Sequence, residues 1–177
     1  FLILKTAPMK TKIIILLTFF SIQMIHAQLT SVTYADKNQK LIGFGIQAKT
    51  PSTNKPGILI LPAWKGIDNH SKEVAQQLSD LNYTAFIADI YGEGNYPANP
   101  QEAGKQSGYY KTNFLEYQKR IQLALEQLIK LGTNPDNIVV IGYCFGGTGA
   151  LETARANINV EGVVSFHGGL GKDVTRF

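Results

Sequence analysis

The apolar positions of this chain form short runs that alternate with longer segments of mixed polarity. Four runs have the composition of strands buried within a parallel sheet. These predicted strands are residues 57–61, 84–88, 138–141 and 160–166. Before them, two β-like stretches on either side of a polar turn predict an antiparallel hairpin, with strands at residues 31–35 and 41–48.

The longer segments carry apolar residues at a spacing of three and four, which predicts helices. The predicted helices are residues 71–81, 114–131 and 147–156. Strands that alternate with helices in this way imply βαβ units, a parallel sheet and right-handed crossovers. Residues 91–113 are rich in Gly, Pro, Asn and Tyr. We expect them to form a long excursion with one short helix, as is typical of a lid or site wall.

The residues after the third predicted strand carry the most informative motif. Gly142-Tyr143-Cys144-Phe145-Gly146 lies between a buried strand and a helix, which is the pattern of a nucleophile elbow with Cys in place of Ser. In so tight a turn the nucleophile takes a strained backbone, and the two glycines remove side chains that would collide. The following helix points its N-terminus at the thiol, which favours a thiolate and an oxyanion.

A cysteine at this position suits acyl transfer, because its thiolate forms more readily than a serine alkoxide. The backbone N–H of Phe145 would be one oxyanion donor. A phosphate-binding turn is excluded, because the chain has neither the Rossmann glycine spacing nor a P-loop motif. A buried structural cysteine beside packing glycines is the remaining alternative. Since Cys144 is the only cysteine, an internal disulfide and a CxxC site are also excluded.

These residues resemble the dienelactone hydrolase family, a Cys-His-Asp branch of the α/β-hydrolases. Three further stretches are similar to that family: residues 61–67, 88–92 and 165–169. The resemblance covers residues 31–177 and implies an α/β-hydrolase fold, with a mostly parallel sheet flanked by helices and truncated at the C-terminus. It also implies hydrolysis of a small ester or lactone through an acyl-enzyme, with no cofactor and no metal.

The same resemblance assigns individual residues. Cys144 matches the nucleophile, and the backbone amides of Phe145 and Trp64 match the oxyanion hole. The family's Asp and His come from later strands and loops, so we expect them beyond residue 177 and expect this fragment itself to be inactive. Ala63 stands where the family commonly has a Glu that interacts with the Cys. A degenerate, non-catalytic binding protein and a thiol-based redox sensor are the alternatives.

Other polar residues near strand ends have structural interpretations. His167 is expected to hydrogen-bond locally rather than to serve as the triad base, His70 to begin a helix, and Asp89 to cap a turn. The three histidines share no metal-ligand spacing. Four residues in or near the excursion either line a pocket or lie on the surface: Tyr91, Glu93, Tyr109 and Tyr110.

The N-terminus has the features of an export signal. Residues 9–27 combine a positive start, an apolar run and Ala27 at a cleavage point. The run is shorter than the roughly 20 apolar residues that span a bilayer. We therefore expect cleavage and an exported protein, periplasmic or secreted, without stable membrane association. Residues 1–8 are expected to be upstream read-through, which leaves 28–177 as the N-terminal portion of one α/β-hydrolase domain.

The formal net charge of +4 gives little reason to expect an acidic partner. Three of the lysines (Lys5, Lys10 and Lys12) precede residue 28, where no Asp or Glu occurs, and without them the charge falls to +1. The remaining basic residues are scattered among acids. Nucleic-acid binding therefore has little support, and a small-molecule ester or lactone is the expected partner.

Overall fold

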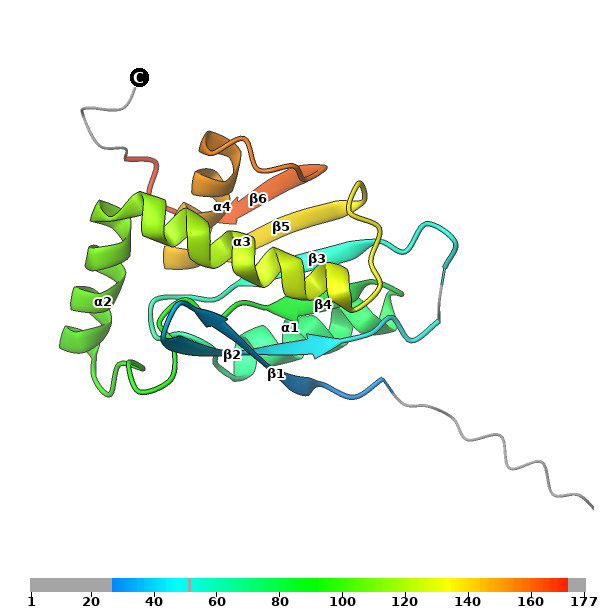
Figure 1. The fold of residues 1–177 in the computed structure, drawn as a ribbon, viewed down its shortest axis with the longest axis horizontal. Coiled ribbons are helices and arrows are strands. Elements are labelled where there is room, and N and C mark those ends of the chain that lie inside the picture. Colours follow the sequence, from blue (N-terminus) through cyan, green and yellow to red (C-terminus); the bar gives the residue numbers. More distant parts are fainter. Residues whose placement is uncertain (1–26, 51, 172–177) are drawn as a thin grey trace, which may run out of the picture.

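The structure is a computed structural model that describes residues 27–50 and 52–171 (Figure 1). Within these ranges the strands are β1 Thr30–Asp36, β2 Gln39–Ile46, β3 Gly57–Leu61, β4 Thr84–Ile87, β5 Ile138–Tyr143 and β6 Gly162–Phe166. The helices are α1 Asn69–Asp80, α2 Pro100–Thr112, α3 Phe114–Lys130 and α4 Phe145–Arg155. The expected read-through (1–8) and signal peptide (9–27) lie outside the described residues, apart from Ala27.

One mixed sheet contains all the described strands, in the order β1-β2-β4-β3-β5-β6. β1 pairs with β2 and β2 with β4 in antiparallel fashion, whereas β4, β3, β5 and β6 pair in parallel. The predicted hairpin and the mostly parallel sheet are thereby confirmed. Parallel pairing brings the carboxyl ends of β3, β4, β5 and β6 to one edge, which is where ligands bind in such sheets.

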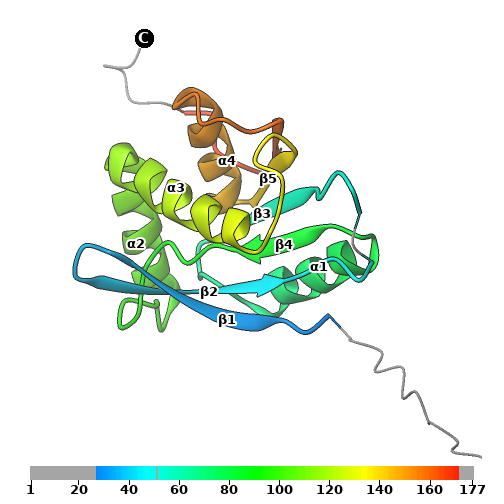
Figure 2. The same cartoon turned by 45° about the vertical axis from the view of Figure 1, so that its right-hand side comes forward.

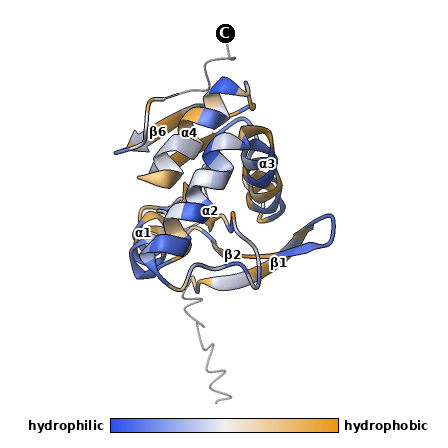
Figure 3. Cartoon of the chain, turned by 90° about the vertical axis from the view of Figure 1, so that its left-hand side faces the viewer, coloured by the Kyte–Doolittle hydropathy of each residue, from blue (hydrophilic) through white to orange (hydrophobic). Residues whose placement is uncertain are grey.

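Helices cover both faces of the sheet (Figures 1 and 2). α1 packs on one face, over β2, β3 and β4, while α3 and α4 pack on the other and α2 lies against α3. The larger core lies between the sheet and α3, and it includes fully buried Leu59, Phe86 and Ile121. The five residues of β3 are all buried, as the continuous apolar run predicts for a central strand. The tip of the β1–β2 hairpin is hydrophilic (Figure 3).

The excursion after β4 contains a helix as predicted, but α2 spans 13 residues and is longer than the short helix expected. The start of this helix carries two recognisable signals. Asn99 caps it by accepting a hydrogen bond from the Glu102 amide at 2.9 Å, and Pro100 occupies the first turn. The two Gly and two Tyr residues of α2 obscured this signal in the sequence, and tertiary packing on α3 overrides their weak helix propensity.

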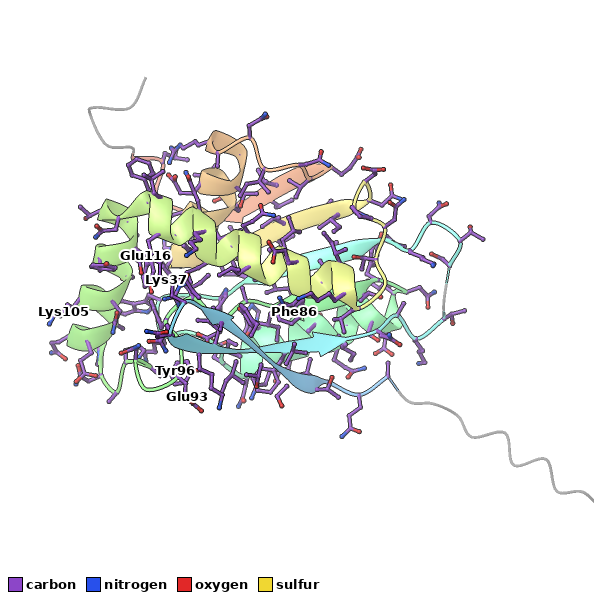
Figure 4. The ribbon with its side chains drawn as sticks, viewed as in Figure 1. Lys37, Phe86, Glu93, Tyr96, Lys105 and Glu116 are labelled. Carbon is purple, nitrogen blue, oxygen red and sulfur yellow. The ribbon has the colours of Figure 1, made fainter. Side chains whose placement is uncertain are left out.

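The loop between β4 and α2 is fixed by Asp89, which caps a turn as predicted. Its carboxylate accepts hydrogen bonds from the amides of Gly92 at 2.9 Å and Ile42 at 2.8 Å, and from the Tyr96 hydroxyl at 2.7 Å. Glu93 forms an ion pair with Lys40 at 3.0 Å. Figure 4 shows Glu93 and Tyr96 close to the β1–β2 hairpin. Polar contacts therefore hold the loop between β4 and α2 against the β1–β2 hairpin.

Candidate active site

The turn between β5 and α4 has the geometry of a nucleophile elbow. β5 ends at Tyr143 and α4 begins at Phe145, so Cys144 alone makes the turn. The backbone angles of Cys144 are φ 53° and ψ −108°, in a region that L-residues rarely occupy. Its amide donates to the carbonyl of Phe166 at 2.8 Å, which ties the strained residue to the end of β6. The predicted strand–turn–helix and its strained centre are confirmed.

The two glycines of the motif are required by steric contacts with backbone. A Cβ on Gly142 would lie 1.9 Å from the carbonyl oxygen of Gly146, on the facing side of the turn. A Cβ on Gly146 would lie 2.0 Å from the carbonyl oxygen of Leu61 and 2.6 Å from that of Pro62. Real Cβ atoms do not approach backbone this closely, so the sequence pattern follows directly from the geometry. The second contact also brings the end of β3 against the first turn of α4.

Cys144 is partly exposed, so the residue is not fully enclosed in the apolar core. It stands at the N-cap of α4, and the first intrahelical hydrogen bond runs from the Thr148 amide to the Cys144 carbonyl at 3.2 Å. The amide of Phe145 precedes this bond, and the first amides of a helix have no intrahelical partner. The helix N-terminus therefore presents amides and its dipole to the thiol.

The second predicted oxyanion donor, Trp64, lies in a tight turn after β3, here called the Trp64 turn (residues 63–66). The amide of Gly66 donates to the carbonyl of Ala63 at 2.9 Å and closes this turn. Gly66 itself has φ +83°, which favours glycine. The Trp64 carbonyl accepts a hydrogen bond from the Tyr91 hydroxyl at 2.7 Å. The turn thus contacts Tyr91, which lies four residues beyond the end of β4.

A cluster of aromatic rings lies beneath the elbow. Phe145, 1% exposed, stacks on Tyr117 with centroids 4.6 Å apart and on Tyr91 at 5.7 Å, and Tyr110 adjoins both tyrosines at 5.9 Å. The Tyr117 hydroxyl also donates to the Phe145 carbonyl at 3.0 Å. Burial raises the pKa of Tyr110 to about 12 and that of Tyr91 further, so both phenols keep their protons at neutral pH. The cluster holds Phe145 rigidly beside Cys144.

Sequence reasoning left the roles of the tyrosines open, and the structure separates them. Tyr91 and Tyr110 are buried, at 2% and 5% exposure, whereas Tyr109 is 47% exposed and donates to Glu116 at 2.7 Å. The Tyr91 contact with Trp64 joins residues 27 positions apart. Sequence offered one clue, because Tyr91 follows a predicted strand end that carries the capping Asp89.

The two histidines near this edge do not hydrogen-bond to the thiol among the described contacts. His70 lies in the first turn of α1, as predicted, and its ring meets Tyr143 edge-on at 5.1 Å. His167 is exposed with φ 60°, directly after the Phe166 that accepts the Cys144 amide. The expected local hydrogen bond of His167 is absent from the hydrogen bonds of the described residues.

Two hollows of the described structure lie far from this edge. One, of about 230 Å³, is lined by residues such as Gln47, Pro56 and Thr84, and another, of about 520 Å³, by Gly57, Tyr83 and others. Both lie at the amino ends of β3 and β4, opposite the thiol. Among residues 27–50 and 52–171, no cluster of His, Cys, Asp and Glu could hold a metal ion. None of the helices in these ranges has the length and apolarity needed to cross a membrane.

A mostly parallel sheet covered by helices, with a strained residue between β5 and α4, defines an α/β-hydrolase fold. The solved structure of m3DLH superimposes with a TM-score of 0.78 at 25% identity, covering 85% of this chain and 64% of that one. A dienelactone hydrolase-like promiscuous phosphotriesterase from metagenomic libraries gives 0.76 at 29% identity, covering 82% and 61%. The predicted fold class is confirmed.

The chain belongs to the dienelactone hydrolase family, whose sequence model matches residues 44–176. This match confirms the resemblance found in the sequence. The "Putative carboxymethylenebutenolidase" of Aquifex aeolicus (strain VF5) is 29% identical over 125 residues, which are 67% of this chain and 54% of the relative. The chain therefore spans about half the length of this curated relative.

Proposed function

We propose that this chain carries the nucleophile of a hydrolase that acts on small esters or lactones through Cys144. The observation that carries the proposal is the position of Cys144, a partly exposed residue at a strained turn with a helix N-terminus beside it. Family membership supports a hydrolase of the ester or lactone type. The phosphotriesterase activity named for one relative belongs to that protein and is not carried over here.

The reaction proposed for Cys144 has two steps. The thiolate sulfur attacks the carbonyl carbon, a C–S bond forms, and the carbonyl oxygen becomes an oxyanion facing the amides of Phe145 and Trp64. The oxyanion collapses, the C–O bond to the leaving group breaks, and the departing oxygen takes up a proton. Water then attacks the thioester, a C–O bond forms, and the C–S bond breaks to release the acid and the thiol.

The second step needs a base to remove a proton from water. We propose that this base, with the carboxylate that orients it, lies in the part of the relatives' length that this chain does not span. The chain alone is then expected to acylate and to turn over slowly. Ala63 leaves the thiol without the acidic neighbour that the family commonly has, so we propose that α4 supplies most of the stabilisation of the thiolate.

A burst experiment tests this proposal. The chain is mixed with p-nitrophenyl acetate, and the release of p-nitrophenolate is followed by absorbance. We expect one equivalent of p-nitrophenolate per chain, followed by slow further release, because the acyl group remains on Cys144. Cys144→Ala removes the sulfur and is expected to abolish the burst.

Cys144→Ser is the matched control, since it keeps the turn and replaces the thiol by a weaker nucleophile. A burst that persists in Cys144→Ala would refute the proposed nucleophile. A wild-type chain that binds the ester without releasing p-nitrophenolate would instead favour the degenerate binding protein. Oxidation of Cys144 by peroxide without any acylation would favour the redox sensor.

We also propose that the protein is exported, on the basis of the charge and hydrophobicity of residues 9–27. N-terminal sequencing of the protein recovered from its host tests this proposal. We expect the mature chain to begin at Gln28. Recovery of a chain that retains residues 9–27 in the cytoplasm would contradict it.

A further inference from the structure

Tyr91 lies where three strand ends of the candidate site meet, and the two-step reaction above gives it no role. It follows β4 by four residues, its hydroxyl donates to the Trp64 carbonyl at 2.7 Å, and its ring stacks on Phe145 at an interplanar angle of 14°. It therefore contacts both residues whose amides form the proposed oxyanion hole. At 2% exposure it is shielded from water.

We propose that Tyr91 is a positioning residue that holds the Trp64 amide at the correct place for the oxyanion. This inference rests on the proposed function, because an oxyanion hole matters only if Cys144 attacks a carbonyl carbon. It goes beyond that function, because it assigns the positioning of an oxyanion donor to a side chain that is distant in sequence from both Trp64 and Phe145.

Two hydrogen bonds fix the two peptide groups on either side of Trp64. The Ala63 carbonyl accepts from the Gly66 amide at 2.9 Å, and the Trp64 carbonyl accepts from Tyr91. In a trans peptide the C=O and N–H point in opposite directions. Because the Ala63 carbonyl points into the turn, the Trp64 N–H points out of it. Tyr91 fixes the next peptide plane and so limits rotation at Trp64.

The Tyr91 ring packs against both the Trp64 turn and Phe145 of the elbow. Ring atoms of Tyr91 would lie 3.6 and 3.8 Å from a Cβ on Gly66, so the ring rests against the Trp64 turn. On its other side the ring stacks on Phe145, with centroids 5.7 Å apart. The ring therefore links the turn to the elbow, in addition to the direct contact of the end of β3 with Gly146.

The Tyr91 hydroxyl is available as a hydrogen-bond donor at neutral pH. Burial, with smaller contributions from Tyr110 and Cys144, raises the pKa of Tyr91. The phenol stays protonated near neutral pH and donates to the Trp64 carbonyl throughout that range. The backbone beside Tyr91 is also held, because buried Arg120 donates from Nη1 to the Ile90 carbonyl at 3.3 Å. The Tyr91 hydroxyl thus keeps its proton, and the backbone next to Tyr91 is held in place.

The test compares two reactions of the Cys144 thiol in the full chain. Acylation by p-nitrophenyl acetate passes through an oxyanion, whereas alkylation by iodoacetamide does not. Tyr91→Phe removes the hydroxyl and keeps the ring. We expect this variant to slow acylation about tenfold and to leave the alkylation rate within about twofold of wild type.

Tyr110→Phe is the matched control, because Tyr110 belongs to the same buried cluster and makes no hydrogen bond to the Trp64 turn among the described contacts. We expect it to leave the ratio of the two rates unchanged. Gly66→Ala strains the turn from its other side, at φ +83°, and is expected to lower the same ratio. Amide hydrogen exchange at residues 63–66 should be faster in Tyr91→Phe.

Three outcomes would overturn the inference. If Tyr91→Phe slows both reactions equally, the residue acts on the thiol or the fold rather than on the oxyanion hole. If acylation of Tyr91→Phe matches that of wild type, the inference is wrong while the proposed function stands. If the wild-type chain is not acylated at Cys144 at all, the proposed function and the inference both fail.

Discussion

The elbow (residues 142–146) and the Trp64 turn (residues 63–66) form the two halves of the candidate site, and they are held in different ways. The elbow is fixed locally, because Gly142 and the backbone of Gly146 meet across a single turn. The Trp64 turn ends at a glycine with positive φ and is held from outside by Tyr91. The comparison indicates that the turn of the proposed nucleophile is encoded mainly in its own motif, whereas the proposed partner donor depends on a side chain distant in sequence.

The largest expected effect comes from disrupting the elbow. Gly142→Ala places a methyl group 1.9 Å from a backbone oxygen, so the turn must deform. We expect a loss of more than about 4 kcal/mol in the free energy of unfolding, measured by urea denaturation. Gly108→Ala in α2 is the control, since its Cβ meets no atom within 4 Å. It should leave stability unchanged or raise it by about 1 kcal/mol.

The next largest effect comes from breaking the ion pair between Asp36 and Arg120, because Arg120 holds the segment that follows β4. Asp36, 8% exposed, forms ion pairs with Lys119 and with buried Arg120 at 2.8 Å, and Arg120 in turn donates to the Ile90 carbonyl. Asp36→Asn leaves the Arg120 charge without its main partner. We expect a loss of about 3 kcal/mol at neutral pH in urea denaturation. Asp80→Asn, which breaks an exposed pair with Lys49, should cost less than about 1 kcal/mol.

This ion pair also predicts a pH dependence. Burial alone would raise the pKa of Asp36, but hydrogen bonds and charges from Lys119 and Arg120 outweigh burial and lower it below 3.8. A lowered native pKa gives stability that is complete above the unfolded value and is lost as the pH falls through the native value. The stability difference between wild type and Asp36→Asn should therefore shrink below about pH 3.8. A difference that grows with acid would contradict the pairing.

The smallest expected effect comes from removing the Trp64 side chain while its backbone amide is kept. The indole is 36% exposed, and the proposed donor is the backbone amide. Trp64→Ala should therefore change the acylation rate much less than Tyr91→Phe does, although Tyr91 is further from the reaction. A larger loss in Trp64→Ala than in Tyr91→Phe would place the indole, rather than the amide, in the site.

The sequence predicts the elbow well because its recognisable motif, a cysteine between two glycines, lies within five neighbouring residues. The buried strands are also predictable, since a strand covered on both faces, such as β3, reads as an uninterrupted apolar run. α2 was underestimated because its Gly and Tyr residues obscured the cap formed by Asn99 and Pro100. Local propensity is a weak guide where packing on a neighbouring helix decides the structure.

Tyr91 could not be assigned from sequence, because its partners Trp64 and Phe145 are distant in sequence, in the turn after β3 and at the start of α4. Its burial depends on how β3, β4 and β5 are ordered in the sheet, which no local pattern specifies. The order places β4, β3 and β5 side by side, so Tyr91 after β4 can reach both the turn after β3 and Phe145 after β5. Predicting this contact requires the topology as well as the motif.

The nucleophile itself is tested most directly by locating the acyl group. The chain is treated with p-nitrophenyl acetate, quenched in acid, digested, and its peptides are examined by mass spectrometry. The account predicts one acetyl group, carried as a thioester by Cys144 and removed by hydroxylamine. Acetyl groups found only on lysine side chains, with Cys144 unmodified but still open to iodoacetamide, would contradict it.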